Sequence, residues 1–364
     1  AANRFVREAR ADRVELYQSD AGRVVLLFVL LAGLLVAYRW RSLPAWLLAA
    51  ILLLVLVDLW TVGRDYFNED DPQLRPRSEL RADLRAYDFD RYILQQVETA
   101  GGSGHFRTLP EALRPQVSAR EAFFYESSGG YHGAKLALYQ DYLDRILYNP
   151  NGSLNENGLD LLSNRFVIAR GPRPGLTPVY RDDETGLVVL ENPDYLPRAS
   201  LVERVEVVPD ADAAIARLTN DGFEPRTTAI LTESAAALLP DGFSPDALAA
   251  PIDSASTAAV TLERFTPREI VWQVDTDAPR LLVASEVYYP AGWVATLDGT
   301  PTEIVRVNHL LRGVAVPEGQ HLIRMRFDPP LHDLGYRISL LATLLVYGSV
   351  LGLGAWGWYR RGKE

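Results

Sequence analysis

The chain has no cysteine, one methionine and only two lysines among its 364 residues. Without cysteine it can form neither a disulfide nor a cysteine-based metal or redox site, although this absence does not identify the compartment. Arginine therefore carries almost all of the positive charge, and the formal net charge is -10. A negative balance of this size argues against nucleic acid as a partner.

The familiar catalytic motifs are also missing. No zinc-protease, serine-hydrolase, dinucleotide-binding or kinase pattern occurs in the sequence. The histidines are scattered and show no metal-ligand spacing; they are His105, His132, His309, His321 and His332. We therefore predict no metal site built by this chain and no evident cofactor, while the chemistry inferred below is compatible with a divalent metal.

Hydropathy divides the chain into two kinds of sequence, although its mean is close to zero. Residues 21–62 contain two apolar runs separated by a short basic connection, and residues 336–359 contain a third. Each run has roughly the 20 residues that a helix needs to cross a bilayer. The pattern predicts a transmembrane helical hairpin at 21–62 and a C-terminal transmembrane helix at 336–359.

Basic residues next to these runs predict the orientation. Arg39 and Arg41 lie between the first two runs, and Arg360, Arg361 and Lys363 follow the third. Such residues favour the cytoplasmic side. The long intervening segment is then extracytoplasmic and the C-terminus cytoplasmic. Residues 1–20 predict an amphipathic helix on the outer side, with a solvated helical linker as the alternative.

The sequence pattern divides the intervening segment, residues 63–330, into three parts. Residues 63–176 are mixed and mostly helical, and residues 177–267 alternate strand and helix. Residues 268–330 contain six period-two runs, with Asp298-Gly299 as a type I′ hairpin turn, and this pattern is typical of a small antiparallel β-sandwich. The predicted fold class is a membrane protein of α+β type, with three transmembrane helices and a large extracytoplasmic α+β region that ends in this sandwich.

The densest chemistry lies in the stretch YESSGGYHGAKLALYQDY, residues 125–142. A glycine pair allows close backbone approach, and polar aromatics beside such a turn suit a carbohydrate or a lipid head group. The candidate substrate-binding residues are Gly129, Gly130, Tyr131, His132, Lys135, Tyr139 and Asp141. The alternative is an ordinary loop and helix entry. The spacing of a phosphate-binding P-loop is absent.

A second aromatic group, Tyr288, Tyr289 and Trp293, lies between two predicted strands. Aromatic faces of this kind stack on sugars, and they also form the corners of β-sandwiches. Both interpretations stay open for these residues.

Several stretches, taken together and in order, resemble the C-terminal half of the bacterial YfhO family of polytopic membrane proteins. They are DLWTVGRDYFNEDD, SSGGYHGAKLALYQDYLD, LDLLSNRFVI, LENPDYLPRASLV and SEVYYPAGWVATLDGTPTEIVRVNHLLRGVAVPEGQHLIRMRF. The resemblance implies further spans upstream and a relation to the GT-C membrane glycosyltransferases, which use a polyprenyl-phosphate sugar. In that class the catalytic acid lies in the first outward loop, so we assign no catalytic residue here.

Two functional hypotheses follow from this resemblance. In the first, the chain is the C-terminal part of a protein of the bacterial inner membrane that transfers sugar from a polyprenyl-phosphate donor to a cell-envelope acceptor, and this part recognises substrate. In the second, it is a non-catalytic membrane subunit whose extracytoplasmic domain binds glycan or a partner complex. The expected partners are the lipid bilayer, the lipid-linked sugar, envelope glycan, and an upstream transmembrane half or other membrane subunits.

Overall fold

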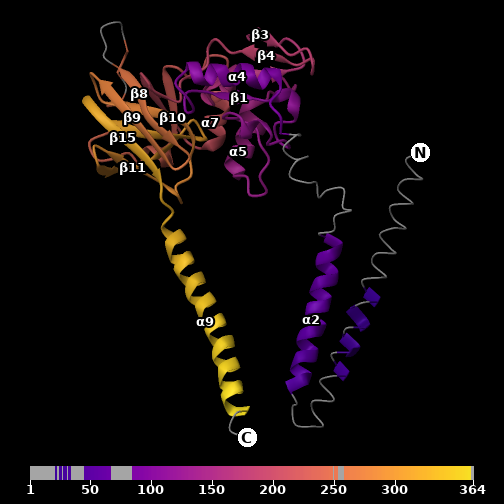
Figure 1. The fold of residues 1–364 in the computed structure, drawn as a ribbon. Coiled ribbons are helices and arrows are strands. Elements are labelled where there is room, and N and C mark those ends of the chain that lie inside the picture. Colours follow the sequence, from indigo (N-terminus) through magenta and orange to yellow (C-terminus); the bar gives the residue numbers. More distant parts are fainter. Residues whose placement is uncertain are drawn as a thin grey trace. The chain divides into compact units, whose positions relative to one another are not determined.

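The computed structural model describes residues 21–22, 24–26, 28–30, 32–33, 45–66, 84–248, 250–252 and 258–361. The chain forms two compact units, Ala1–Arg85 and Ala86–Glu364 (Figure 1). The predicted amphipathic segment 1–20 and the connection with Arg39 and Arg41 lie outside the described residues, and those interpretations stay predictions.

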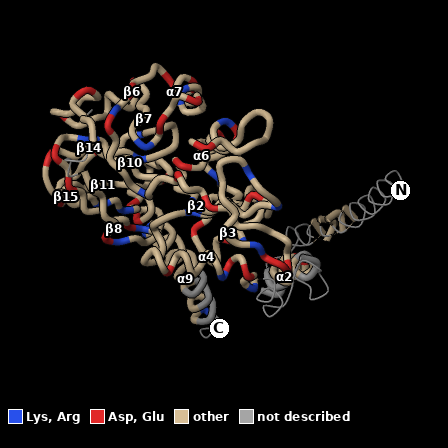
Figure 2. Tube along the Cα trace, turned by 90° about the horizontal axis from the view of Figure 1, so that it is seen from above, with Lys and Arg blue, Asp and Glu red and all other residues tan. Residues whose placement is uncertain are grey.

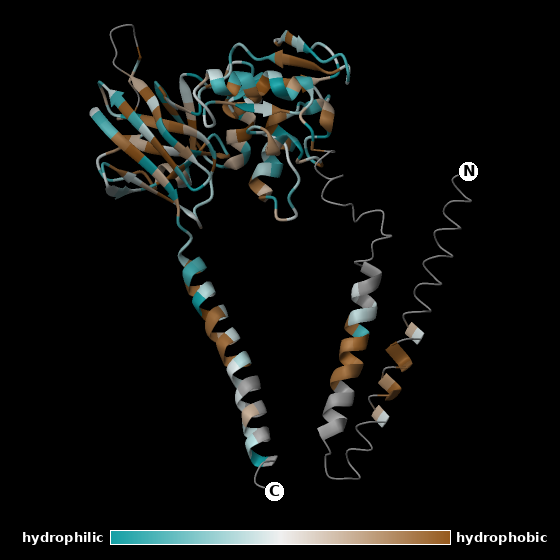
Figure 3. Ribbon diagram, in the orientation of Figure 1, coloured by the Kyte–Doolittle hydropathy of each residue, from teal (hydrophilic) through white to brown (hydrophobic). Residues whose placement is uncertain are grey.

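The prediction of three transmembrane helices is wrong. The relevant helices are α2 (Ala45–Tyr66) and α9 (Pro330–Arg361), and among the described residues no helix combines the length and the apolar character that a bilayer crossing requires. The described part of α2 contains a charged side chain, Asp58. The described part of α9 begins with hydrophilic residues, among them Asp333 and Arg337 (Figure 3).

The α+β character is present in the second unit, whose described residues form three sheets. The first sheet has four strands in the order β1 (Arg107–Leu109), β2 (Asn164–Ala169), β4 (Val188–Glu191) and β3 (Thr177–Arg181). β1 is parallel to β2, and the other pairs are antiparallel. Helix α4 (Asp88–Thr99) places Phe89 and Ile93 one turn apart, so both side chains pack on the sheet.

The second sheet has six strands that come from distant parts of the chain. From edge to edge they are β5 (Ala199–Leu201), β10 (Arg280–Val287), β14 (Leu311–Val316), β13 (Val305–Val307), β7 (Thr228–Thr232) and β6 (Arg204–Val208). β6 and β7 are parallel and are connected through α7 (Ala211–Leu218), as parallel neighbours require a crossover. The side chain of Asp210 caps this helix by accepting a hydrogen bond from the Ala213 amide at 2.9 Å.

The third sheet has five antiparallel strands, which lie side by side in Figure 1. Their order is β12 (Thr300–Thr302), β11 (Trp293–Leu297), β15 (Gly319–Phe327), β9 (Glu269–Thr276) and β8 (Ala259–Thr266). Trp272, Ile323 and Met325 from this sheet share one buried core with Leu282 and Val314 of the six-stranded sheet. The two sheets therefore pack face to face as a β-sandwich.

The six period-two runs predicted within residues 268–330 are all strands, but they divide between the two sheets of the sandwich. The Asp298-Gly299 turn between β11 and β12 is confirmed, with φ of 51° and 83°. Positive φ at both positions defines the predicted type I′ turn. Strands β5, β6 and β7 complete the six-stranded sheet from the part predicted as a separate region at 177–267.

A larger core joins the four-stranded sheet to the six-stranded one. It contains buried residues of α5 (Ala137–Tyr142), the π-helical turn η3 (Leu143–Leu147) and α6 (Glu156–Leu161), together with residues of β2, β4, β7 and β13. The remaining short helices are η1 (Glu111–Leu113), η2 (Glu121–Phe123) and α8 (Glu233–Ala236). Basic and acidic residues are interspersed along this unit (Figure 2).

Candidate functional site

A cavity of about 310 Å³ forms where β1, the start of α5 and β10 meet. Its lining includes three of the predicted substrate-binding residues, Gly129, Lys135 and Tyr139. Apolar contacts come from Leu136, Leu162 and Val287. The polar groups around it belong to Arg107, Ser127, Ser128, Lys135, Tyr139 and Ser285. We call it the Arg107 cavity.

Arg107 begins β1, and its side chain is held from several directions. Nη1 donates hydrogen bonds to the Leu162 carbonyl at 3.1 Å and to Ser285 Oγ at 3.0 Å. Nη2 lies 3.2 Å from Glu286 Oε1. Burial, followed by repulsion from Arg198, lowers the pKa of the guanidinium below its usual value. The group is therefore a fixed cation at the wall of the cavity.

The glycine pair shapes the loop at the opposite wall. A Cβ at Gly129 would lie 2.9 Å from the carbonyl oxygen of Pro115 and 2.9 Å from Pro110 Cγ, so a larger residue does not fit without moving the backbone. Gly130 has a φ of 140°, which favours glycine, and its amide donates to the same Pro115 carbonyl. The loop is thus held close to the residues before it, and this places Ser128 at the cavity.

Helix α5 supplies Tyr139 to the cavity, and the residues just before it supply Lys135. The Tyr139 hydroxyl donates to the Ser128 carbonyl, and burial raises the pKa of Tyr139 to about 12. Lys135 Nζ donates to Gln140 Oε1 at 2.8 Å. Among the described residues, no carboxylate forms an ion pair with Lys135, so its positive charge is available at the cavity.

The other predicted members of this motif lie elsewhere. Tyr131 and His132 are exposed and are not lining residues, and His132 Nδ1 accepts a hydrogen bond from the Ala134 amide at 3.0 Å. Asp141 Oδ2 lies 2.7 Å from Nε2 of the buried His309, and Asp141 Oδ1 lies 3.5 Å from Arg145. These contacts give Asp141 partners within the protein and away from the cavity lining.

Behind the Arg107 cavity lies a network of buried ion pairs that sequence reasoning missed. Arg198 contacts both Glu126 and Glu286, and its side chain is 4% exposed. Burial alone would raise the pKa of Glu286, but Arg107 and Arg198 outweigh it and hold that pKa below its usual value. Glu286 therefore stays ionised and fixes the two arginines.

The second predicted group also surrounds a cavity. Tyr288, Tyr289 and Trp293 line a space of about 330 Å³, together with Glu303 and the buried Arg312. We call it the Arg312 cavity. The guanidinium carbon of Arg312 lies 3.9 Å from the centroid of the Trp293 ring. This distance is typical of a cation–π contact.

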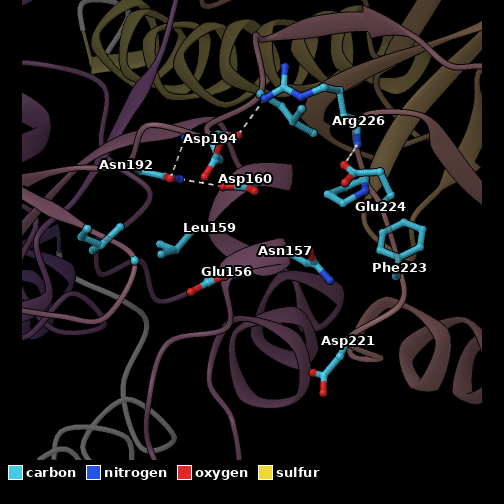
Figure 4. Close-up of a pocket in the computed structure, with 14 residues that line it drawn as sticks. Glu156, Asn157, Leu159, Asp160, Asn192, Asp194, Asp221, Phe223, Glu224 and Arg226 are labelled. Atoms are coloured by element: carbon cyan, nitrogen blue, oxygen red, sulfur yellow. Dashed lines mark hydrogen bonds between the residues drawn. The ribbon is translucent and has the colours of Figure 1, made fainter.

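A third cavity, of about 280 Å³, has several acidic side chains and Arg226 in its lining (Figure 4). Asp160 of α6 accepts a hydrogen bond from Asn192 Nδ2 at 2.6 Å. Burial raises the pKa of Asp160 to about 7, because it outweighs the lowering effect of that hydrogen bond. Glu156, Asp194 and Glu224 also line the space. Asp160 is thus a carboxyl group poised to exchange a proton near neutral pH.

The chain offered a weak signal for the missed residues. Arg107, Arg198 and Arg312 each interrupt an apolar stretch, in HFRTL, LPRASLV and LLRGVAV. A charged side chain in such a stretch is rarely buried unless it has a partner. Identifying that partner requires the fold, since Arg198 and Glu286 are 88 residues apart in sequence.

Within the described ranges, no group of three or more histidine or acidic side chains has the arrangement needed to hold a metal ion. This part of the chain therefore provides no set of protein ligands for the divalent metal with which the predicted chemistry is compatible.

A family model described as bacterial membrane protein YfhO matches residues 243–339. This confirms the predicted resemblance over that segment, which contains the Arg312 cavity's aromatic residues. Similarity to a bacterial membrane-protein family agrees with the predicted bacterial origin, and the orientation stays a prediction. No curated protein and no solved structure matches the chain.

Proposed function

We propose that the unit Ala86–Glu364 recognises a phosphate-bearing sugar, of the polyprenyl-phosphate type, for glycosyl transfer in the bacterial cell envelope. The resemblance to the YfhO family supports this choice of chemistry. The observation that carries the proposal is the Arg107 cavity, because it gathers Lys135, Tyr139 and Arg107 around one space. We assign no catalytic residue in this chain.

The chemistry of the cavity suits such a ligand. Lys135 offers a cation without a described carboxylate partner, and a phosphate is bound well by such a charge. The hydroxyl groups of Ser127, Ser128 and Ser285 can exchange hydrogen bonds with sugar hydroxyls. Leu136 and Val287 supply apolar surface for the face of a sugar ring or for the first carbons of a lipid chain.

The test is binding of a short-chain polyprenyl-phosphate glucose to the full chain in detergent, measured by calorimetry with and without Mg²⁺. We expect Lys135→Ala to weaken binding roughly ten- to hundredfold, since a hydrogen bond to a charged group contributes about 1.5–3 kcal/mol. Lys135→Arg should retain most of the affinity. Lys363→Ala makes the same change of charge at the other lysine and is the matched control.

Equal affinities of Lys135→Ala and Lys363→Ala would refute the proposal. Sugar transfer by the intact protein is then compared between Lys135→Ala and His132→Ala. The exposed position of His132 predicts the smaller loss for the histidine variant.

The second candidate is a non-catalytic subunit that binds glycan through its aromatic residues. It is favoured by one observation, the gathering of Tyr288, Tyr289 and Trp293 around a cavity of their own. Glycan binding without any sugar transfer by the intact protein would support this candidate over the first.

A further inference from the structure

Arg312 is buried beside a cavity, and its guanidinium group does not have all the hydrogen-bond partners that it can use. Its side chain lies on β14 and is 3% exposed. Nε donates to the Val287 carbonyl at 2.9 Å, and one face of Trp293 covers the guanidinium. Nη1 is buried and has no hydrogen-bond partner among the described residues. An unmade hydrogen bond at a buried charged donor costs more than at a neutral one, so this atom suggests a ligand.

The charges around Arg312 do not balance. The buried network contains Arg107, Arg198 and Arg312 against Glu126 and Glu286, which leaves one positive charge. Both carboxylates already form ion pairs with Arg107 or Arg198. No described carboxylate lies in an ion pair with Arg312. Glu303 also lines the cavity but is exposed, so water weakens its interaction with Arg312 without abolishing it. Glu286 attracts Arg312 without forming an ion pair with it, so the buried charge is only partly compensated, and an anionic ligand group would relieve the remaining cost.

The rest of the cavity is suited to a sugar ring. Tyr289 is 38% exposed and Tyr288 is half-buried, and both line the space that Arg312 reaches. Arg312 covers one face of Trp293 and Phe327 stacks on Tyr289, so Tyr288 and the exposed part of Tyr289 offer the available aromatic surface. Thr302 adds a hydroxyl group at the wall. The guanidinium fork matches a planar carboxylate better than it matches a neutral hydroxyl.

We propose that the Arg312 cavity binds an acidic saccharide, with its ring against Tyr288 and Tyr289 and its carboxylate on Arg312. The inference deepens the proposed glycan recognition by naming a uronic acid as the sugar class. The inference does not depend on the Arg107 cavity, because binding at that cavity is tested separately with the polyprenyl-phosphate probe.

The experiment uses the full chain and two probes that differ only at carbon 6, methyl β-D-glucuronide and methyl β-D-glucoside. Binding is measured by ligand-observed NMR titration at low ionic strength, where screening is least. We expect the glucuronide to bind at least tenfold more tightly than the glucoside. Arg312→Gln should abolish this preference, while Arg324→Gln, at an arginine that is 52% exposed on β15, should keep it. Equal binding of the two probes to the unmodified chain would overturn the proposal.

Glu303→Gln provides a second variant that leaves the buried network intact. It removes a negative charge from the cavity wall and should raise glucuronide affinity about two- to fivefold, with the glucoside unchanged. An unchanged preference in Glu303→Gln would also contradict the proposal. Binding of the polyprenyl-phosphate probe is measured on each variant, so a failure at the Arg107 cavity is distinguished from a failure at the Arg312 cavity.

Discussion

At the scale of single residues, the chain places charge inside apolar surroundings. Arg198 and Arg312 are almost fully buried, and so is Asp160. Burying such a charged group lowers the stability of the fold unless a partner compensates the charge. Arg198 has two carboxylate partners, whereas among the described residues the Asp160 side chain accepts a hydrogen bond from neutral Asn192 and forms no ion pair. Ionisation of Asp160 therefore opposes folding.

The first residue-scale prediction concerns pH. The pKa of Asp160 is about 7 in the folded chain, against an ordinary value near 3.8. Between these values the folded state holds a proton that the unfolded state has released. The free energy of unfolding therefore falls as the pH rises from about 4 to 7, by up to about 1.4 kcal/mol per pH unit from this group.

Asp160→Asn keeps the hydrogen bond from Asn192 and removes the titration. The free energy of unfolding of the variant should equal that of the unmodified chain near pH 4 and should be larger at pH 8. Urea unfolding at a series of pH values measures the difference. A stability difference that stays constant between pH 4 and pH 8 would contradict the assignment of the raised pKa to Asp160.

At the scale of elements, strand β14 passes very close to β13. A Cβ at Gly313 would lie 2.3 Å from Val307 Cγ2 and 3.1 Å from Val305 Cγ2. Both valines are buried and branched, so they have little room to turn away. Glycine at this position is what allows the centre of the six-stranded sheet to pair and pack.

Gly313→Ala should lower the free energy of unfolding by about 1–3 kcal/mol, the usual cost of overpacking a core. Thermal and urea unfolding measure the loss. The double variant Gly313→Ala with Val307→Ala removes the nearest methyl groups. It should lose less than the sum of the two single changes, and strict additivity would show that the close contact is not the cause.

At the scale of the whole molecule, the segment that resembles the YfhO family contains the whole five-stranded sheet but only three strands of the six-stranded one. Residues 243–339 include β10, β13 and β14, but their neighbours β5 and β7 come earlier in the chain. Ala199 and Leu201 of β5 also belong to the core between the two sheets. The similar segment is therefore one part of a larger folding unit.

We expect a fragment of residues 243–339 to lack a cooperative unfolding transition, because its six-stranded sheet loses β5, β6 and β7, and the core between the two sheets loses Ala199 and Leu201. The unit of residues 86–364 should unfold cooperatively. Amide NMR dispersion and calorimetry test both. A well-dispersed spectrum from the short fragment would show that β5 and β7 are dispensable.

Local sequence chemistry determined much of this protein. Period-two alternation predicted the strands of residues 268–330, because a strand with one buried face alternates its side chains, and the Asp298-Gly299 pair determined its turn through the positive φ that such a turn requires. Three residues of the motif around Gly129 line a cavity, and their role in binding substrate stays a prediction. The apolar runs misled at the level of fold class, since their described parts do not make a membrane span.

Only the tertiary structure decided which distant residues meet. Tyr139 and Lys135 reach the cavity of Arg107, whereas Tyr131 and His132 from the same motif remain exposed. The pairing of Arg198 with Glu286 depends on β5 lying beside β10 in the six-stranded sheet, and the contact of Arg312 with Trp293 joins that sheet to the five-stranded one. Burial and long-range pairing set the charge of these groups, and neither is encoded in the spacing of neighbouring residues.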